Sequence, residues 1–417
     1  MIRFLIILAN IIILCSTPFI TPYLIPGYSA VVAALLIILL FGVYKLDLKF
    51  GKDAWTKSLV FCIVIAVIHG TLTSLFFFDE DGTAGFRNAI GMTMKYMFVL
   101  MAIPLIKQNY NQFHTLFWNI HIVIILLSVL LFFLCFVGVY LPYIEFSPDG
   151  REHYFFYIGS SNHMYEFGDR IFLRIAGYCD EPGRLALILT YLLVLNEYTF
   201  KKAILRILIC FAGVLTFSAA FFITIVPIVY FWALNKIVNI KSIFVGIFIA
   251  LLVSAVYIMN LDNETQENIG DAVEVMITNR FERGSDGKFH GDNRSEAISY
   301  QVEAFEQSPI IGVLGKGENY MIKQRIYTMT FFSGMARYGI FNLLLYLPFV
   351  LLLRKYWKTS QKWLFFSIGL NFLQRPELEH MFFLIVLTFI YYNQYFEDSG
   401  VSTSDSRHKG AYVKIEQ

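Results

Sequence analysis

The chain has 417 residues, of which 57% are hydrophobic and 17% aromatic, while only 15% are charged. A soluble domain usually carries about a quarter charged residues, so this chain has more apolar surface than a water-soluble core encloses. The formal net charge is +2 and the basic residues are dispersed in short clusters, which argues against a nucleic-acid partner. The composition therefore indicates an integral membrane protein solvated by membrane lipid.

Long apolar runs separated by short polar stretches predict an all-α, polytopic protein with about twelve transmembrane helices. The first run lacks an A-x-A-like cleavage site and is interpreted as a retained span rather than a signal peptide. Together the runs define one transmembrane domain over residues 1–396. The predicted spans are 2–20, 29–44, 57–78, 89–106, 115–140, 184–200, 203–217, 218–235, 241–260, 329–353, 361–374 and 380–396.

Positive charge in the short connections sets the predicted orientation, because Lys and Arg are retained on the cytoplasmic side. The connections that carry Lys52, Lys107, Lys202 and Lys358 all fall on one side of the predicted bundle. Both termini are then cytoplasmic. The tail at 397–417 is polar and has no hydrophobic period, so it is predicted to be a disordered cytoplasmic tail.

The same orientation places two long loops, near 141–183 and 261–328, on the external face. Function concentrates on irregular segments held by a rigid scaffold, so these loops are the predicted location of the site. Within the second loop, Ile298, Val302 and Phe305 recur at helical spacing and predict a helix over 293–307.

Cysteine usage gives no disulfide framework. Four of the five cysteines lie inside apolar runs and are interpreted as small hydrophobic residues. Cys179 alone falls in a predicted aqueous loop, and a single exposed thiol forms no internal disulfide.

Charged residues cluster in both long loops. The first loop ends in DRIFLRIAGYCDEPGR, and the second contains NRFERGSDGKFHGDNR followed by SPIIGVLGKGEN. Guanidinium groups bind phosphate oxygens through a planar two-point fork, so the loops suit a diphosphate substrate or leaving group. The predicted site residues are Arg170, Arg174, Asp180, Glu181, Arg184, Arg280, Arg283, Arg294 and Lys316.

The chain resembles the O-antigen polymerase (Wzy) family, within the broader O-antigen polymerase and ligase group. The topology shared with this group covers most of the chain. The residues that carry the resemblance form three short elements. They are Arg174, Gly177, Glu181 and Pro182 in the first loop, Arg294, Pro309, Gly312, Gly315 and Gly317 in the second, and Gly334 with Tyr338-Gly339-Ile340 in the span that follows.

The resemblance implies a glycosyltransferase that uses an undecaprenyl-diphosphate-linked oligosaccharide in a bacterial inner membrane. The growing glycan would pass to a hydroxyl of the next lipid-linked repeat unit, with a flippase and a chain-length regulator as functional partners. Glu181 is the expected base, with Asp180 as the other carboxylate considered for that task. Arg174 and Arg294 would complete the catalytic set by stabilising the leaving diphosphate.

The resemblance assigns the remaining charged loop residues to substrate binding. They are Arg170, Asp180, Arg184, Arg280, Arg283 and Lys316. The loop histidines lack metal-ligand spacing, and arginines neutralise a diphosphate without a metal. We therefore expect no cofactor and no metal requirement.

Structural interpretations stand beside these roles. A carboxylate before Pro182 also suits a helix cap, Arg184 at a span end also suits contact with lipid headgroups, and the glycine-rich stretch suits an ordinary turn. Arg375 and its charged neighbours near Pro376 are expected to form an intramolecular ion-pair network, with a contribution to the cavity as the second possibility.

Two other functions compete with polymerisation. An O-antigen ligase of the same group would carry an essential His after the glycine turn, and residues 318–340 contain none, which favours the polymerase. A lipid-linked oligosaccharide flippase would show repeated halves and ionisable groups along a midplane path; no internal repeat is seen here. A receptor or scaffold stays open from sequence alone.

Overall fold

We describe the protein from a computed structural model, which is mostly helical. The structure describes residues 1–16, 19, 21–24, 28–47, 52–78, 80–139, 141–147, 152–167, 170–237, 259, 261, 263–276, 295–328, 330–375 and 380–398. The predicted span at 241–260 and the tail after residue 398 lie outside these ranges, apart from residue 259. The helices are α1 (Ile2–Leu14), α2 (Thr21–Leu24), α3 (Tyr28–Lys45), α4 (Ala54–Phe76), α5 (Gly82–Phe136), α6 (Pro182–Tyr198), α7 (Ala203–Leu215), α8 (Ala219–Leu234), α10 (Asn263–Met276), α11 (Ser295–Gln307), η2 (Leu314–Lys316), α12 (Glu318–Lys323), α13 (Phe331–Tyr338), α14 (Phe341–Leu345), α15 (Leu347–Tyr356), α16 (Lys362–Gln374) and α17 (Met381–Asp398).

Among the described residues, two helices are long and apolar enough to cross a membrane, α4 and α5 from Thr83 onward. The other apolar helices are shorter. A helix of 13 residues, such as α1 or α7, covers about 20 Å at 1.5 Å per residue, against roughly 30 Å of hydrocarbon. The predicted count of about twelve spans therefore stays a prediction.

The helix boundaries can be compared with the predicted spans in two places. The spans predicted at 89–106 and 115–140 lie on the two sides of a kink in α5, where two helices meet at Asn109, the residue with non-helical backbone angles. Conversely, the span predicted at 329–353 is divided into α13, α14 and α15. Its first break falls at Gly339, where φ is +57° and no helix continues.

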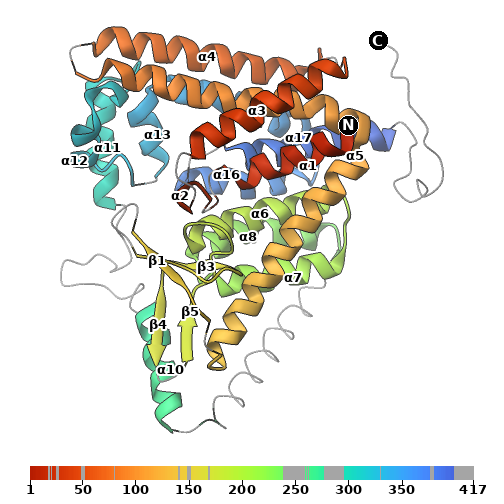
Figure 1. The fold of residues 1–417 in the computed structure, drawn as a ribbon, viewed down its shortest axis with the longest axis vertical. Helices are drawn as coiled ribbons and strands as arrows, with labels where there is room; N and C mark the ends of the chain where they lie inside the picture. The colour runs from red at the N-terminus through yellow and green to blue at the C-terminus, as the bar shows by residue number, and fades with distance from the viewer. Residues whose placement is uncertain are drawn as a thin grey trace.

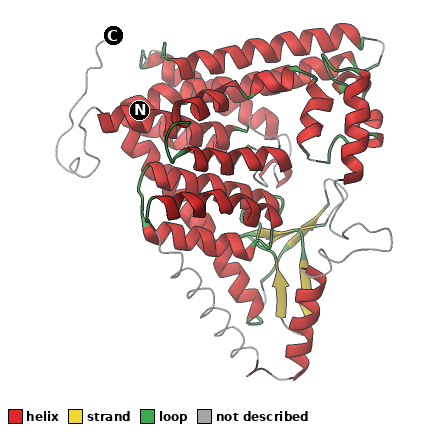
Figure 2. Cartoon of the chain, turned by 180° about the vertical axis from the view of Figure 1, so that it is seen from behind, coloured by secondary structure: helices red, strands yellow, loops and turns green. Residues whose placement is uncertain are grey.

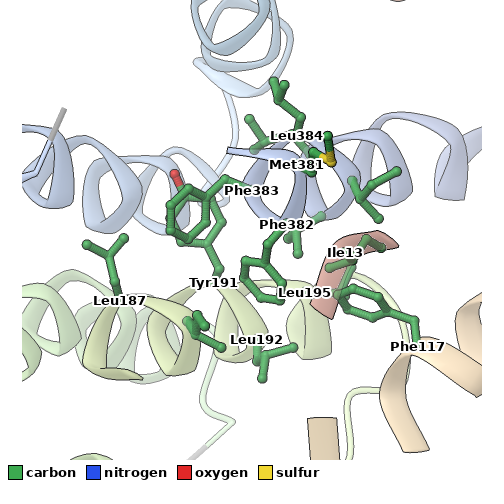
Figure 3. Packing of buried hydrophobic residues seen from close by; sticks show 14 of the residues in the cluster. Ile13, Phe117, Leu187, Tyr191, Leu192, Leu195, Met381, Phe382, Phe383 and Leu384 are labelled. Carbon is green, nitrogen blue, oxygen red and sulfur yellow. The ribbon is translucent and has the colours of Figure 1, made fainter. Parts of the chain in front are cut away.

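Helix α6 lies at the centre of the helical body. All of its residues are buried except Gly183 and Arg184. Figure 3 shows side chains of α6, α5 and α17 packed together: the rings of Tyr191 and Phe383 lie 4.5 Å apart between centroids, and those of Phe117 and Phe382 lie 5.7 Å apart. A helix that is apolar on all sides belongs in a protein interior, so the position of the α6 N-terminus is fixed by packing.

Large apolar side chains cover the outside of the helical body. Five of them, on α1, α3, α4, α5 and α8, are between 49% and 67% exposed: Phe4, Phe41, Val67, Leu126 and Val226. Exposed apolar surface of this extent marks a partner or a membrane. It fits contact with either membrane lipid or a partner protein.

The two ends of α4 separate two polar regions. At its N-terminus, Asp53 accepts hydrogen bonds from Lys107 Nζ and from the hydroxyl of Tyr392, each at 2.9 Å. Beyond its C-terminus, the Asp81 amide donates to the Gly315 carbonyl at 3.1 Å. The 23 residues of α4 span about 34 Å. The connection that contains Lys107 and the part of the second long loop that contains Gly315 therefore lie at opposite ends of α4.

The first long loop contains two small antiparallel sheets, which the all-α prediction did not include. One sheet has the order β1-β2-β3 and the other is the hairpin β4-β5. The strands lie together beside the helical body, on the side away from Met1 (Figures 1 and 2). Their bounds are β1 (Ile144–Phe146), β2 (His153–Phe155), β3 (Ser160–Ser161), β4 (Met164–Phe167) and β5 (Arg170–Leu173).

The second long loop forms α10, α11, η2 and α12 within the described residues. Helix α11 (Ser295–Gln307) confirms the helix predicted at 293–307. Its most buried residues are Ala297, Gln301 and Ala304, one position away from the predicted apolar stripe. The buried amide of Gln301 is satisfied because its Nε2 donates to the carbonyls of Arg325 and Thr328, both at 2.8 Å.

The glycine-rich stretch after α11 crosses the segment after α13 at close range. A Cβ on Gly312 would lie 2.2 Å from the Arg337 carbonyl oxygen, and one on Gly339 would lie 2.3 Å from that of Ile310. Both glycines have positive φ, +71° and +57°. The Val313 amide donates to Ala336 O at 2.8 Å. The close backbone contacts and the positive φ require glycine at positions 312 and 339, so both glycines have a structural role.

Candidate functional site

The candidate site lies at the N-terminus of α6, where the first long loop enters the helical body. Pro182 is the first helical residue, which its fixed φ favours. Glu181 occupies the N-cap position with extended backbone angles, φ −151° and ψ 154°, but its side chain makes no capping hydrogen bond among the described residues. It forms an ion pair with Arg375 instead. The helix-cap interpretation thus holds for the backbone of Glu181 and fails for its carboxylate.

Two carboxylates and two guanidinium groups meet at this point. Asp180 Oδ2 lies 2.6 Å from Arg184 Nη1, and Glu181 pairs through Oε1 with Nη2 of Arg375. The side chains are 2%, 13%, 14% and 8% exposed for Asp180, Arg184, Glu181 and Arg375. The formal charges cancel, which is how buried ions are tolerated. The site therefore contains carboxylates that can accept a proton next to guanidinium groups that can stabilise negative charge.

The backbone leading to the site is hydrogen-bonded to the first small sheet. The single Ser160 hydroxyl hydrogen is shared between the carbonyls of Gly177 and Cys179, which lie 2.9 and 2.6 Å from Oγ, and His153 Nδ1 donates to the Asp180 carbonyl at 2.8 Å. Gly177 has φ +65°, a conformation that favours glycine. The strands therefore fix the carboxylates of the next residues relative to α6.

The sequence predicted an exposed thiol at Cys179, and the structure shows that this prediction is wrong. Cys179 is 1% exposed and its backbone pairs with Phe19. Burial, together with the charge of Asp180, raises the pKa of its thiol well above the ordinary value. A buried thiol with a raised pKa is unreactive, so we interpret Cys179 as a structural residue next to the N-terminal segment.

Arg174 lies apart from this cluster. It is 5% exposed, and its Nε and Nη2 donate to the carbonyls of Thr216 and Phe217 at 3.0 and 3.1 Å. Thr216 is the C-cap of α7, and a cation at a helix C-terminus is favourable. These contacts explain why Arg174 is buried, with no need for a substrate contact. The catalytic role of Arg174 stays a prediction.

The other predicted site residues are dispersed or lie outside the described residues. Arg170 opens β5 and is partly exposed. Lys316 is in the second loop, with Nζ 2.9 Å from Gln307 Oε1. Three arginines of the second loop lie outside the described residues: Arg280, Arg283 and Arg294. The structure therefore brings together Asp180, Glu181 and Arg184 of the predicted set.

Arg375 is the site residue whose pairing with Glu181 the sequence did not predict. It lies at the C-terminal end of α16, 194 positions from Glu181, and no spacing rule links the two. The expected ion-pair network around Pro376 was one indication, because it placed an arginine at the same external side. The pairing itself needs the three-dimensional arrangement of α6 and α16.

An apolar groove lies beside the segment that leads to the cluster. Its cavity has a volume of about 410 Å³ and lies between the end of α1, α2 and the second half of α5. Tyr178, two residues before Asp180, forms part of its wall, and Val123 on α5 is 52% exposed. The lining residues are Leu14, Phe19, Thr21, Asn119, Ile120, Val123, Ile124, Leu127 and Tyr178.

No group of three or more His, Cys, Asp or Glu side chains placed to hold a metal ion occurs in the part of the chain that the structure describes. Comparison with protein-family models, with curated proteins and with solved structures finds no match to this chain.

Proposed function

We propose that this protein is a polytopic membrane glycosyltransferase that polymerises a polysaccharide from polyprenyl-diphosphate-linked repeat units. The observation that carries the proposal is the buried cluster of two carboxylates and two guanidinium groups at the N-terminus of α6. Such a cluster supplies a base for an acceptor hydroxyl and cations for a leaving diphosphate. The resemblance of Arg174, Gly177, Glu181 and Pro182 to the O-antigen polymerase family supports the same assignment.

The proposed reaction is one displacement at the anomeric carbon of the donor glycan. The acceptor hydroxyl oxygen of the next lipid-linked repeat unit forms the new glycosidic bond, and the bond from the anomeric carbon to the diphosphate oxygen breaks. The hydroxyl proton passes to the carboxylate of Glu181. The lipid diphosphate leaves with the bonding electron pair, and Arg184 stabilises its negative charge. Asp180 holds Arg184 in place through the 2.6 Å ion pair.

The apolar groove supports a lipid-linked substrate. Its lining includes no Asp, Glu, Lys or Arg, and Tyr178, two positions before Asp180 in the sequence, forms part of its wall. A hydrocarbon chain in this groove would place its polar headgroup near Asp180 and Glu181. The proposal therefore assigns the groove to the isoprenoid chain of the donor or the acceptor.

The proposed topology has about twelve spans in a bacterial inner membrane, with both termini cytoplasmic and both long loops external. Two features support it. The apolar side chains on the outside of the helical body suit hydrocarbon, and the Lys107 and Gly315 regions lie at opposite ends of α4. Reporter fusions after Lys202 and Lys358 should be cytoplasmic, and fusions within 265–275 should be external.

Deletion of the gene followed by gel analysis of the surface glycan tests the proposal. A polymerase deletion leaves single repeat units on the lipid A core or its equivalent, and a plasmid copy restores the ladder. Loss of all surface-attached glycan, with intact lipid-linked polymer, would instead assign the protein as a ligase. Accumulation of single lipid-linked units on the cytoplasmic face would assign it as a flippase.

A further inference from the structure

We infer that Arg375 is a positioning residue for Glu181, and that Gly183 keeps free the space that the guanidinium group needs. This inference rests on the proposed function, because it concerns the base of the proposed reaction. It adds a residue from the far end of the chain to the site. It also assigns a role to a glycine in the first turn of α6.

The contact geometry joins these three residues. Arg375 pairs through Nη2 with Glu181, and a Cβ built on Gly183 would lie 3.0 Å from that same Nη2. The Nε and Cζ atoms of Arg375 would lie 3.7 Å from it. The guanidinium group therefore packs against the backbone of the first α6 turn, where an added Cβ would force Nη2 to shift by a few tenths of an ångström.

The backbone of Arg375 is itself fixed. Its amide donates to the Asn371 carbonyl at 2.7 Å, which ends α16. The residue is 7% exposed, and its Nε has no hydrogen-bond partner among the described residues. Glu181 on one side and Gly183 on the other therefore set the orientation of the guanidinium group, and this orientation in turn fixes the carboxylate.

A fixed carboxylate has a direct consequence for catalysis. A base acts only within hydrogen-bond reach of the proton it accepts, and a small misplacement of reacting groups lowers the rate of the chemical step strongly. A lysine at position 375 would retain the charge but lack the planar fork. Disturbing Arg375 should therefore lower kcat while the affinity for the lipid-linked donor changes little.

The sharpest perturbation is Gly183→Ala, because it alters no charged group. Its matched control is Gly91→Ala in α5, where an added Cβ meets nothing within 4 Å. Both place alanine in a helix, so both gain helix propensity. With purified full-length protein and lipid-linked repeat units, we expect Gly183→Ala to lower kcat by about tenfold or more, with KM within about threefold. Gly91→Ala should keep the wild-type kcat.

Two variants at position 375 complete the test. Arg375→Gln should lower kcat by about a hundredfold, and Arg375→Lys should recover part of that loss. Addition of guanidinium ion to an Arg375→Ala variant should restore activity, a response that a purely structural arginine would not give. All variants are compared at equal amounts of folded protein.

The outcomes separate the inference from the proposed function. If wild-type protein polymerises and the Arg375→Gln and Gly183→Ala variants retain its kcat, Arg375 does not position Glu181 and the proposed function stands. A rise in KM alone, with kcat unchanged, would also overturn the inference. If the wild-type protein makes no polymer, the proposed function fails and takes the inference with it.

Discussion

Arg174 is the residue for which sequence and structure lead to different expectations. The resemblance assigns it to catalysis, whereas the structure has it donating to the carbonyls of Thr216 and Phe217 at the end of α7. Hydrogen bonds from a charged group contribute about 1.5–3 kcal/mol each. Arg174→Ala removes both and leaves two carbonyls without these donors, so we expect a loss of roughly 3 kcal/mol or more.

Thermal unfolding in detergent and a polymerisation assay on the same preparations test this expectation. Arg174→Ala should lower the melting temperature by several degrees, while the kcat of the protein that remains folded stays within about threefold of wild type. Arg174→Lys should be intermediate in stability, because one ammonium group reaches one carbonyl at a time. An unchanged melting curve with a hundredfold loss of kcat would refute this reasoning and place Arg174 at the substrate.

Three further predictions follow from other parts of the structure. Gly339→Ala should lower the melting temperature, because φ is +57° and the added Cβ would lie 2.3 Å from a carbonyl oxygen, whereas Gly270→Ala, in open space on α10, should not. Burial raises the pKa of Asp53, but the hydrogen bonds from Lys107, the Thr56 amide and Tyr392 outweigh it, so the net pKa is lowered. The stability that the Asp53 carboxylate contributes is therefore present above its unfolded pKa of about 3.9 and lost as pH falls through the folded value. The difference in melting temperature between wild type and Asp53→Asn should shrink from pH 7 to pH 3. Ile120→Trp in the groove should raise KM for the lipid-linked substrate severalfold, and Val64→Trp, on the exposed face of α4, should leave it unchanged.

The sequence predicted best the features that depend on local patterns. The helical spacing of Ile298, Val302 and Phe305 predicted α11, and its end at Ser308-Pro309 agrees with the structure. The glycine-rich stretch was predicted as a turn, but its tight crossing with the segment at Gly339 was not. That crossing depends on two segments more than twenty residues apart, and no local pattern reports it.

The kink in α5 lies inside the stretch that the sequence predicted to separate two spans. The stretch KQNYNQFH at 107–114 is polar enough to predict a loop between two spans. In the structure the break is a kink at Asn109 rather than a longer loop, and polar groups of this stretch have partners on other elements. Lys107 bonds to Asp53, and the Tyr110 hydroxyl donates to Asn393 at 3.1 Å.

The site was predicted in part for a similar reason. Asp180, Glu181 and Arg184 are close in sequence, and the start of a helix at Pro182 brings them to one place. Arg375 joins them only because α16 ends beside α6. The strands of the first loop are two to four residues long, too short for a period of two to be distinguished from an aromatic-rich loop.

The most direct test of the proposed function uses purified full-length protein in lipid vesicles with lipid-linked repeat units and no nucleotide sugar. Wild-type protein should convert single units into a ladder of longer glycans on a gel, and Glu181→Gln should abolish the ladder. Glu145→Gln, at an exposed position on β1, should give the wild-type ladder. A wild-type protein that makes no polymer under these conditions, or a Glu181→Gln variant as active as wild type, would contradict the account.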